Sequence, residues 1–125
     1  MRLAEVVEKL SAGQKSTVLR CAESCDILDL NTEVNPNVNP EVLTFLKAVS
    51  NPIRLQMLKL LKNTWLCVCL ISKILEKDQT LISHHLRVLK ESGLLEERRE
   101  GKMRFYRANS EALRNYLELV MTEIV

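Results

Sequence analysis

Apolar residues recur at helical spacing along much of the chain, and this pattern predicts a mainly α-helical protein. Over residues 3–11 they fall on one face, which predicts a short amphipathic helix ended by Gly13. The segment NTEVNPNVNP, from Asn31 to Pro40, is rich in Asn and Pro and is typical of a linker. We therefore expect an N-terminal helix and arm over residues 1–39 and a main domain over residues 40–125.

The main domain begins with three predicted helices. Pro40 starts the first; the tripeptide SNP ends it and starts the second, with Asn51 as N-cap and Pro52 at the first helical position. Arg54, near the start of that second helix, is expected to be a solvated residue. The apolar stretch TWLCVCLIS leads into the third helix, which we expect to run to about Glu76.

A tight turn is predicted after the third helix, because the polar segment EKDQT is short. A fourth helix follows from Asp78 or Gln79 to Glu91 and stops at Gly93. Next, LLEERREGKMRFYRA alternates loosely around REGK, which predicts a β-hairpin with Gly101 at its tip. Two helices joined by a tight turn and followed by a two-stranded hairpin are the element order of a winged helix-turn-helix. The predicted fold class is therefore mainly α, with one β-hairpin (α+β).

The fourth helix has one apolar and one polar face. Ile82, His85, Leu86 and Leu89 recur at i, i+3, i+4 and i+7, so we expect them to pack inward. Most soluble helices have a polar outer face, but this one lies next to a basic hairpin, and the combination favours contact with DNA. The helix residues expected to contact DNA are Gln79, Thr80, Ser83, His84 and Arg87. The hairpin residues expected to contact DNA are Arg98, Arg99, Lys102 and Arg104. Arg107 is a further basic residue of the hairpin.

Charge is distributed unevenly, although the 125-residue chain has a net charge of only +2. Gln79–Arg107 holds seven Lys or Arg residues and four Glu, whereas Ala108–Val125 holds one Arg and three Glu. Basic charge thus coincides with the fourth helix and the hairpin. No run of about 18 apolar residues is present, so no membrane span is expected. The amphipathic N-terminus argues against a signal sequence, and we expect a cytoplasmic protein with reduced thiols.

Catalytic residues are not indicated by the sequence. We find no plausible acid–base pair, no phosphate-cradling glycine loop and no Ser/His/Asp set. We therefore expect neither an enzyme nor a small organic substrate.

A final helix follows the hairpin, and we expect Ser110 to cap it. Its apolar stripe could belong to the monomer core. Its length and position instead favour a homodimer interface, with the N-terminal helix as a further contributor. The residues of this stripe are Leu113, Leu117, Val120, Met121 and Ile124.

Four cysteines occur as two close pairs. Cys21 and Cys25 are spaced i, i+4 and share a face if that segment is helical, so they could chelate one ion. Cys67 and Cys69 are spaced i, i+2, which places side chains about 200° apart on a regular helix. They can share an ion only where the backbone is extended or a helix is just starting. A single cysteine is more often a small core residue, but two pairs suggest a site for a soft ion such as Cd(II), Pb(II) or Zn(II).

Three segments together resemble the ArsR/SmtB family of metal-responsive repressors: LKAVSNPIRLQMLKLL, the Cys-Val-Cys run and LISHHLRVLKESGLLEERREGKMRFYRA. The likeness covers roughly Pro40 to Tyr106. It implies a dimeric winged-helix repressor that binds double-stranded operator DNA at its own promoter and leaves it on binding metal. CAESC resembles the N-terminal cysteine pair of the cadmium/lead (CadC-like) branch. The resemblance therefore implies that all four cysteines form one metal site, which bridges the subunits.

The chain departs from the family pattern at three positions. Leu70 stands where an Asp usually follows Cys-Val-Cys, which bears on packing and tuning and not on the thiolates. Ser110 and Ala112 stand where the Asp and His of a second metal site on the terminal helices are expected. The chain has only two histidines, His84 and His85, and both lie in the predicted DNA-reading helix. We expect that second site to be absent.

Other uses of the cysteines remain open. Three of the thiolates could bind As(III) in a pyramidal site. A redox switch is a second alternative, although a Cys-x-Cys disulfide closes a small strained ring. A metal-buffering or structural-zinc module that binds protein partners is a third, which the basic hairpin and the polar helix face disfavour.

Overall fold

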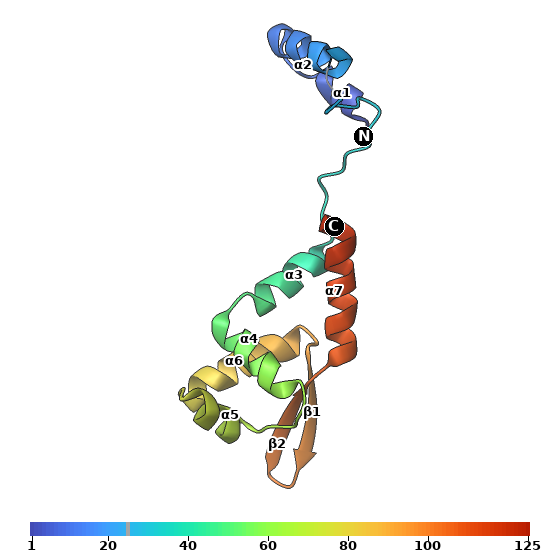
Figure 1. Ribbon diagram of the computed structural model, residues 1–125. Helices are drawn as coiled ribbons and strands as arrows, with labels where there is room; N and C mark the ends of the chain where they lie inside the picture. The colour runs from blue at the N-terminus through green and yellow to red at the C-terminus, as the bar shows by residue number, and fades with distance from the viewer. Residues whose placement is uncertain (25) are drawn as a thin grey trace. The chain divides into compact units, whose positions relative to one another are not determined.

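The computed structural model describes residues 1–24 and 26–125, and the chain divides into two compact units, Met1–Asn37 and Val38–Val125. The first unit contains α1 (Leu3–Val7) and α2 (Ala12–Ser24) (Figure 1). The prediction that Gly13 ends the first helix is wrong, because Gly13 lies in the first turn of α2. Ser11 and Gln14 form a reciprocal capping box there: the backbone N–H of each donates to the other's side chain at 3.3 Å.

Part of the predicted linker is hydrogen-bonded within the first unit. The backbone N–H of Leu3 donates to the Thr32 carbonyl, and that of Val34 donates to the Met1 carbonyl. Arg2 and Glu33 form an isolated antiparallel bridge. The start of the Asn/Pro-rich segment therefore folds back on the start of the chain, and only its later residues connect the two units.

The second unit follows the predicted element order, and its fold is a winged helix-turn-helix. Its elements are α3 (Pro40–Val49), α4 (Pro52–Leu61), α5 (Val68–Leu75), α6 (Gln79–Glu91), β1 (Leu95–Glu100), β2 (Met103–Ala108) and α7 (Ser110–Ile124). Asn51 caps α4 as predicted: its side chain accepts from the N–H groups of Ile53 and Arg54. The cap of α7 is Asn109 and not Ser110, because the Asn109 side chain accepts from Ala112 N at 3.1 Å.

The core of the second unit lies between the helix-turn-helix and the base of the hairpin. The four α6 residues predicted to face inward are buried, including His85 at 6% exposure. They pack with residues from neighbouring elements, among them Phe45, Met57, Leu61, Ile71, Leu94 and Tyr106. Because α6 is held by this core on one side, its other side is presented to solvent.

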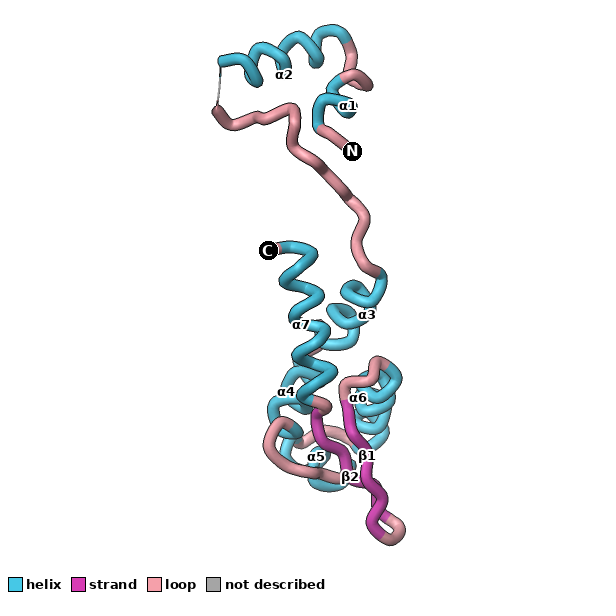
Figure 2. The backbone as a smooth tube through the Cα atoms, turned by 90° about the vertical axis from the view of Figure 1, so that its right-hand side faces the viewer, coloured by secondary structure: helices cyan, strands magenta, loops and turns pink. Residues whose placement is uncertain are grey.

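Two glycines with positive φ set the path of the chain from α6 through the hairpin. Gly93 (φ 73°) ends α6 in a Schellman motif, in which Leu94 N donates to the Leu89 carbonyl at 3.0 Å. Gly101 (φ 61°) occupies the hairpin tip as predicted. The strands pair antiparallel, with Leu95 opposite Ala108, and the hairpin extends past α5 and α6 (Figure 2).

Helices α3 and α7 pack side by side at the other end of this unit (Figure 1). The rings of Phe45 and Tyr116 stack with centroids 5.0 Å apart. Among the described residues, no helix is both long enough and apolar enough to cross a membrane.

Candidate nucleic-acid interface and cysteine pair

The outer face of α6 is polar and exposed. All five residues that the sequence assigned to it are exposed to solvent: Gln79, Thr80, Ser83, His84 and Arg87. Nη2 of Arg87 lies 3.2 Å from Nδ1 of His84.

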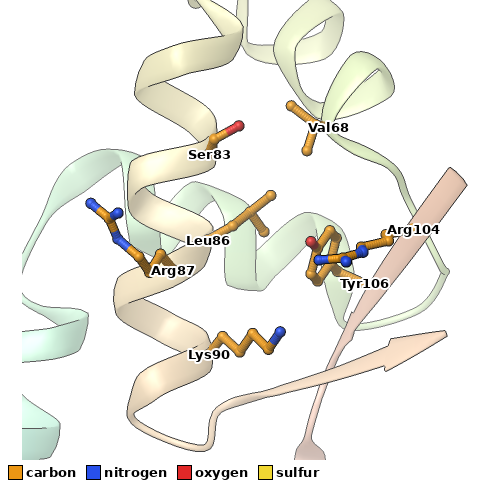
Figure 3. A pocket seen from close by; sticks show the side chains of 7 residues that line it. All are labelled: Val68, Ser83, Leu86, Arg87, Lys90, Arg104 and Tyr106. Atoms are coloured by element: carbon orange, nitrogen blue, oxygen red, sulfur yellow. The ribbon is translucent and has the colours of Figure 1, made fainter. Parts of the chain in front are cut away.

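A hollow of about 210 Å³ lies between α6 and the hairpin (Figure 3). Its walls come from three elements: α6, strand β2 and the first turn of α5. The lining residues are Val68, Ser83, Leu86, Arg87, Lys90, Arg104 and Tyr106. Three of them are cations, so the hollow can accept an anionic group such as a DNA phosphate.

The strand register sorts the basic hairpin residues onto two faces. Arg99 and Arg104 are paired and share the face that also carries Glu97 and Tyr106. Arg98 lies on the other face, where its Nε is 2.6 Å from Oε1 of Glu100. Both groups of that ion pair are more than half exposed, so it contributes little to stability. Arg98 therefore remains available to a phosphate.

Arg107 differs from the other hairpin cations. Its guanidinium is 2.8 Å from Oε2 of Glu96 and stacks over the Trp65 ring, 4.6 Å from the centroid. These contacts attach the base of the hairpin to the segment that precedes α5. Arg107 is thus part of the scaffold of the hairpin, which its position in the sequence did not reveal.

Glu97 links the hairpin to α6 within the basic surface. One of its carboxylate oxygens is 2.5 Å from Nζ of Lys90, and the other is 3.5 Å from Nε of Arg104. The hydrogen bond from Lys90 lowers the pKa of Glu97, which keeps the carboxylate ionised. Apart from the presence of an acid in a basic segment, no signal in the sequence indicated this contact.

Arg54 is not the solvated residue that we expected. Its Nε donates to the Ala48 carbonyl at 2.5 Å, its Nη2 to the Lys47 carbonyl at 3.1 Å, and its Nη1 lies 3.2 Å from Nδ1 of His85. It thereby joins the C-terminal end of α3 to the buried side of α6. Burial, followed by the charges of Arg54 and His84, lowers the pKa of His85, so the ring is neutral and accepts through Nδ1.

Cys67 and Cys69 lie where α5 begins. Cys67 is the N-cap residue, with an extended backbone (φ −93°, ψ 168°), and is 5% exposed. Cys69 is exposed in the first helical turn. This is the arrangement under which an i, i+2 pair can share an ion.

Of the other two predicted metal ligands, the structure describes only Cys21. Cys21 is half-buried on α2 in the first unit, and Cys25 lies outside the described residues. Within residues 1–24 and 26–125, no three Cys, His, Asp or Glu side chains gather into a potential metal site. Ser110 and Ala112 occupy the first turn of α7, and both histidines lie on α6.

The helix-turn-helix, the exposed polar face of its second helix and the basic hairpin define a winged helix-turn-helix DNA-binding protein. Residues 51–97 match the family described as "Bacterial regulatory protein, arsR family". The chain belongs to this family, and it is a transcriptional regulator.

Two relatives and one solved structure illustrate the relationship. An uncharacterised HTH-type transcriptional regulator of Methanocaldococcus jannaschii is 43% identical over 59% of this chain and 84% of its own. A cadmium resistance transcriptional regulatory protein CadC homolog of Staphylococcus aureus is 35% identical over 64% of this chain and 68% of its own. A homodimeric winged helix-turn-helix DNA-binding domain of Mycobacterium bovis superposes with a TM-score of 0.56 at 28% identity, covering 71% of this chain and 89% of that one.

Proposed function

We propose that the protein is a metal-responsive repressor that binds operator DNA as a homodimer through α6 and the hairpin. A thiophilic ion (Cd, Pb or Zn) bound by cysteine thiolates releases it from DNA. The observation that carries this proposal is the place of Val68. This residue stands between Cys67 and Cys69 and also lines the hollow between α6 and β2. In our proposal, Val68 transmits a change at the two thiolates to the groups that bind DNA. The cadmium-resistance name of the Staphylococcus aureus relative favours the same effector class.

The backbone offers a second connection between the cysteines and the hairpin. Leu66, which directly precedes Cys67, exchanges two hydrogen bonds with Tyr106 of β2, at 3.0 and 2.8 Å. In our proposal, a displacement of Cys67 on ion binding moves β2 against α6 through these two bonds. Release requires only that the ion prefer the displaced arrangement, and couplings of this kind are typically about 1–3 kcal/mol, a change of roughly 5–150-fold in DNA affinity.

The proposed ligands are Cys67 and Cys69, completed by Cys21 and Cys25. Sulfur donors suit soft ions, and the bound ion would supply a fixed charge and a set of bond directions for the thiolates. Support for the N-terminal pair comes from the CAESC spacing alone. In our proposal Cys67 and Cys69 are indispensable for release, and Cys21 and Cys25 complete the site.

The proposed dimer surface lies on α7 and α3. Of the predicted α7 stripe, Leu113 and Val120 are half-buried against the core of the same unit. Leu117 (53% exposed), Met121 and Ile124 are open to solvent, and so are Leu43 and Leu46 of α3. They continue into an apolar hollow of about 410 Å³ that is rimmed by Lys59, Lys62 and Arg114. The C-terminal half of α7 carries Glu118 and Glu123, so a second copy can bring acidic groups to that basic rim. The Mycobacterium bovis domain is itself homodimeric.

One titration tests the effector. Reduced protein on a duplex that it has selected from a random pool is titrated with Cd(II), while thiolate absorption and DNA affinity are followed together. Cys67→Ser and Cys69→Ser should keep the affinity of the metal-free protein and abolish release, whereas Cys21→Ser should weaken Cd(II) binding and retain part of the response. Release of the Cys67→Ser variant at the wild-type Cd(II) concentration would contradict the proposal. Parallel arms with As(III), and with an oxidant in the absence of metal, test the two alternative signals.

A second experiment tests the DNA-binding surface. Ser83→Ala and Arg87→Ala should each cost about 1–3 kcal/mol of specific binding if they contact bases. Lys102→Ala should weaken binding to all sequences and reduce the salt slope by about one. Lys9→Ala is the control: it removes the same charge from an exposed position in the first unit, outside the proposed DNA surface, so its salt slope should stay near wild type. An unchanged affinity after Ser83→Ala and Arg87→Ala together would rule out this face of α6.

A further inference from the structure

Two of the cations in the hollow between α6 and the hairpin already have an anionic partner. Lys90 extends from α6 and Arg104 from β2 (Figure 3), and each is paired with a different oxygen of the Glu97 carboxylate, at 2.5 and 3.5 Å. The side chain of Glu97 is only 25% exposed, whereas those of Lys90 and Arg104 are 50% and 58% exposed. The acid is thus fixed beneath two cations that face solvent.

The strand register explains why this acid is fixed. Glu97 lies opposite Tyr106, so it shares the hairpin face that bears Arg104 and looks toward α6. Its carboxylate spans from the hairpin to Lys90 on the helix. The three side chains carry a net charge of +1 in place of the +2 that the two cations alone would supply. A phosphate that enters the hollow must share both cations with a carboxylate and is repelled by it.

We propose that Glu97 is an internal competitor for DNA phosphate, which holds Lys90 and Arg104 partly neutralised and thereby limits the sequence-independent affinity of the protein for DNA. The inference rests on the proposed DNA-binding role of α6 and the hairpin. It assigns to Glu97 the role of a tuning residue that acts through the two cations. Because phosphate contacts carry no sequence information, its effect is the same on every duplex.

Glu97→Gln tests the inference, because it removes the charge and keeps the size of the side chain. Its salt slope should be steeper than wild type by about 0.9 for each additional phosphate that the protein neutralises. For one such phosphate, the ratio of variant to wild-type affinity should be roughly eightfold larger at 0.1 M salt than at 1 M. This increase should be equal on the selected duplex and on a scrambled one. Glu100→Gln is the matched control: it removes the same charge from the same hairpin, on the face that carries Arg98, and should give a smaller change.

The two cations provide the decisive comparison. In a Lys90→Gln/Arg104→Gln background, Glu97→Gln should no longer raise DNA affinity. An increase that persists there, or one no larger than that of Glu100→Gln, overturns the inference. A second comparison uses no Glu97 variant and so does not depend on its folding. Because Lys90 is already paired with Glu97, Lys90→Gln should reduce the wild-type salt slope by less than Lys102→Gln does. Equal reductions would also overturn it.

These outcomes are separable from failure of the proposed DNA surface. If Arg87→Ala weakens DNA binding and Glu97→Gln behaves as Glu100→Gln does, the surface stands and the role of Glu97 is refuted. If Arg87→Ala and Lys102→Gln both leave DNA binding unchanged, the surface itself is wrong.

Discussion

Arg54→Ala should destabilise the fold by about 2–4 kcal/mol, although Arg54 looks like an ordinary surface residue in the sequence. Its guanidinium donates to two carbonyls at the end of α3 and contacts Nδ1 of the buried His85. The contacts to Ala48 and His85 are partly buried, and hydrogen bonds to a charged group contribute about 1.5–3 kcal/mol each. The contact to Lys47 is exposed and adds little. Because the contacts share one side chain, the total is less than their sum.

Urea unfolding followed by far-UV circular dichroism measures this loss. Gln56→Ala on the same helix is the matched control, since the Gln56 side chain is exposed and lines neither the hollow beside the hairpin nor the one on the proposed dimer surface. It should change stability by less than about 0.5 kcal/mol. Arg54→Lys should restore under half of the loss, because a single ammonium cannot reach all three acceptors.

A double-mutant cycle isolates the link between α4 and α6. Arg54→Ala combined with His85→Ala should show a coupling energy on the order of 1 kcal/mol. Two results would contradict this expectation: an effect of Arg54→Ala as mild as that of Gln56→Ala, or a cycle that shows no coupling energy. Either result would mean that the guanidinium contacts do not hold α6 against the end of α3.

Three further predictions address the turn, the pH dependence and the dimer. Glu76→Gly should stabilise the protein by about 0.5–1 kcal/mol in urea unfolding, because Glu76 ends α5 in the left-handed region (φ 53°, ψ 46°), where a β-carbon is strained; a loss of stability would contradict this. His85 has a lowered pKa in the folded protein, so its contribution to stability is complete above its unfolded pKa of about 6.5 and is lost as the pH falls from there toward the folded value. The urea midpoint should therefore fall over that window, and it should fall less in His85→Gln; identical pH profiles would disprove the assignment. Leu117→Ala should raise the dimer dissociation constant about 10–100-fold in sedimentation equilibrium, since burial of a leucine contributes about 1.5–3 kcal/mol; an unchanged constant would remove Leu117 from the interface.

Local signals in the sequence were sufficient to predict most of the helices and the hairpin of the second unit. The spacing of apolar residues placed α6 and its buried face, Asn51 and Pro52 placed the start of α4, and Gly101 placed the hairpin tip. The extended backbone at Cys67 fulfils the condition under which an i, i+2 pair can share an ion. Each of these features depends on a few consecutive residues, so one sequence can specify it.

Prediction was weaker where two local signals competed. Gly13 was interpreted as a helix end, but the Ser11–Gln14 capping box starts α2 at Ala12, so Gly13 lies in its first turn. Asn109 took the capping position assigned to Ser110 because its side chain reaches Ala112 N. Both residue types are good caps, and only the backbone geometry decides between neighbours.

The sequence by itself therefore determined the order of elements in the second unit, the polar face of α6 and the spacing of the two cysteine pairs. The tertiary structure decided which charged groups are engaged: Arg54 with His85, Arg107 with Glu96, and Glu97 with Lys90 and Arg104. The physical reason is that helix and hairpin periodicity is set by neighbours along the chain. An ion pair between elements depends instead on strand register and on the packing of α6 against the hairpin, which place residues distant in the sequence within a few ångströms of each other.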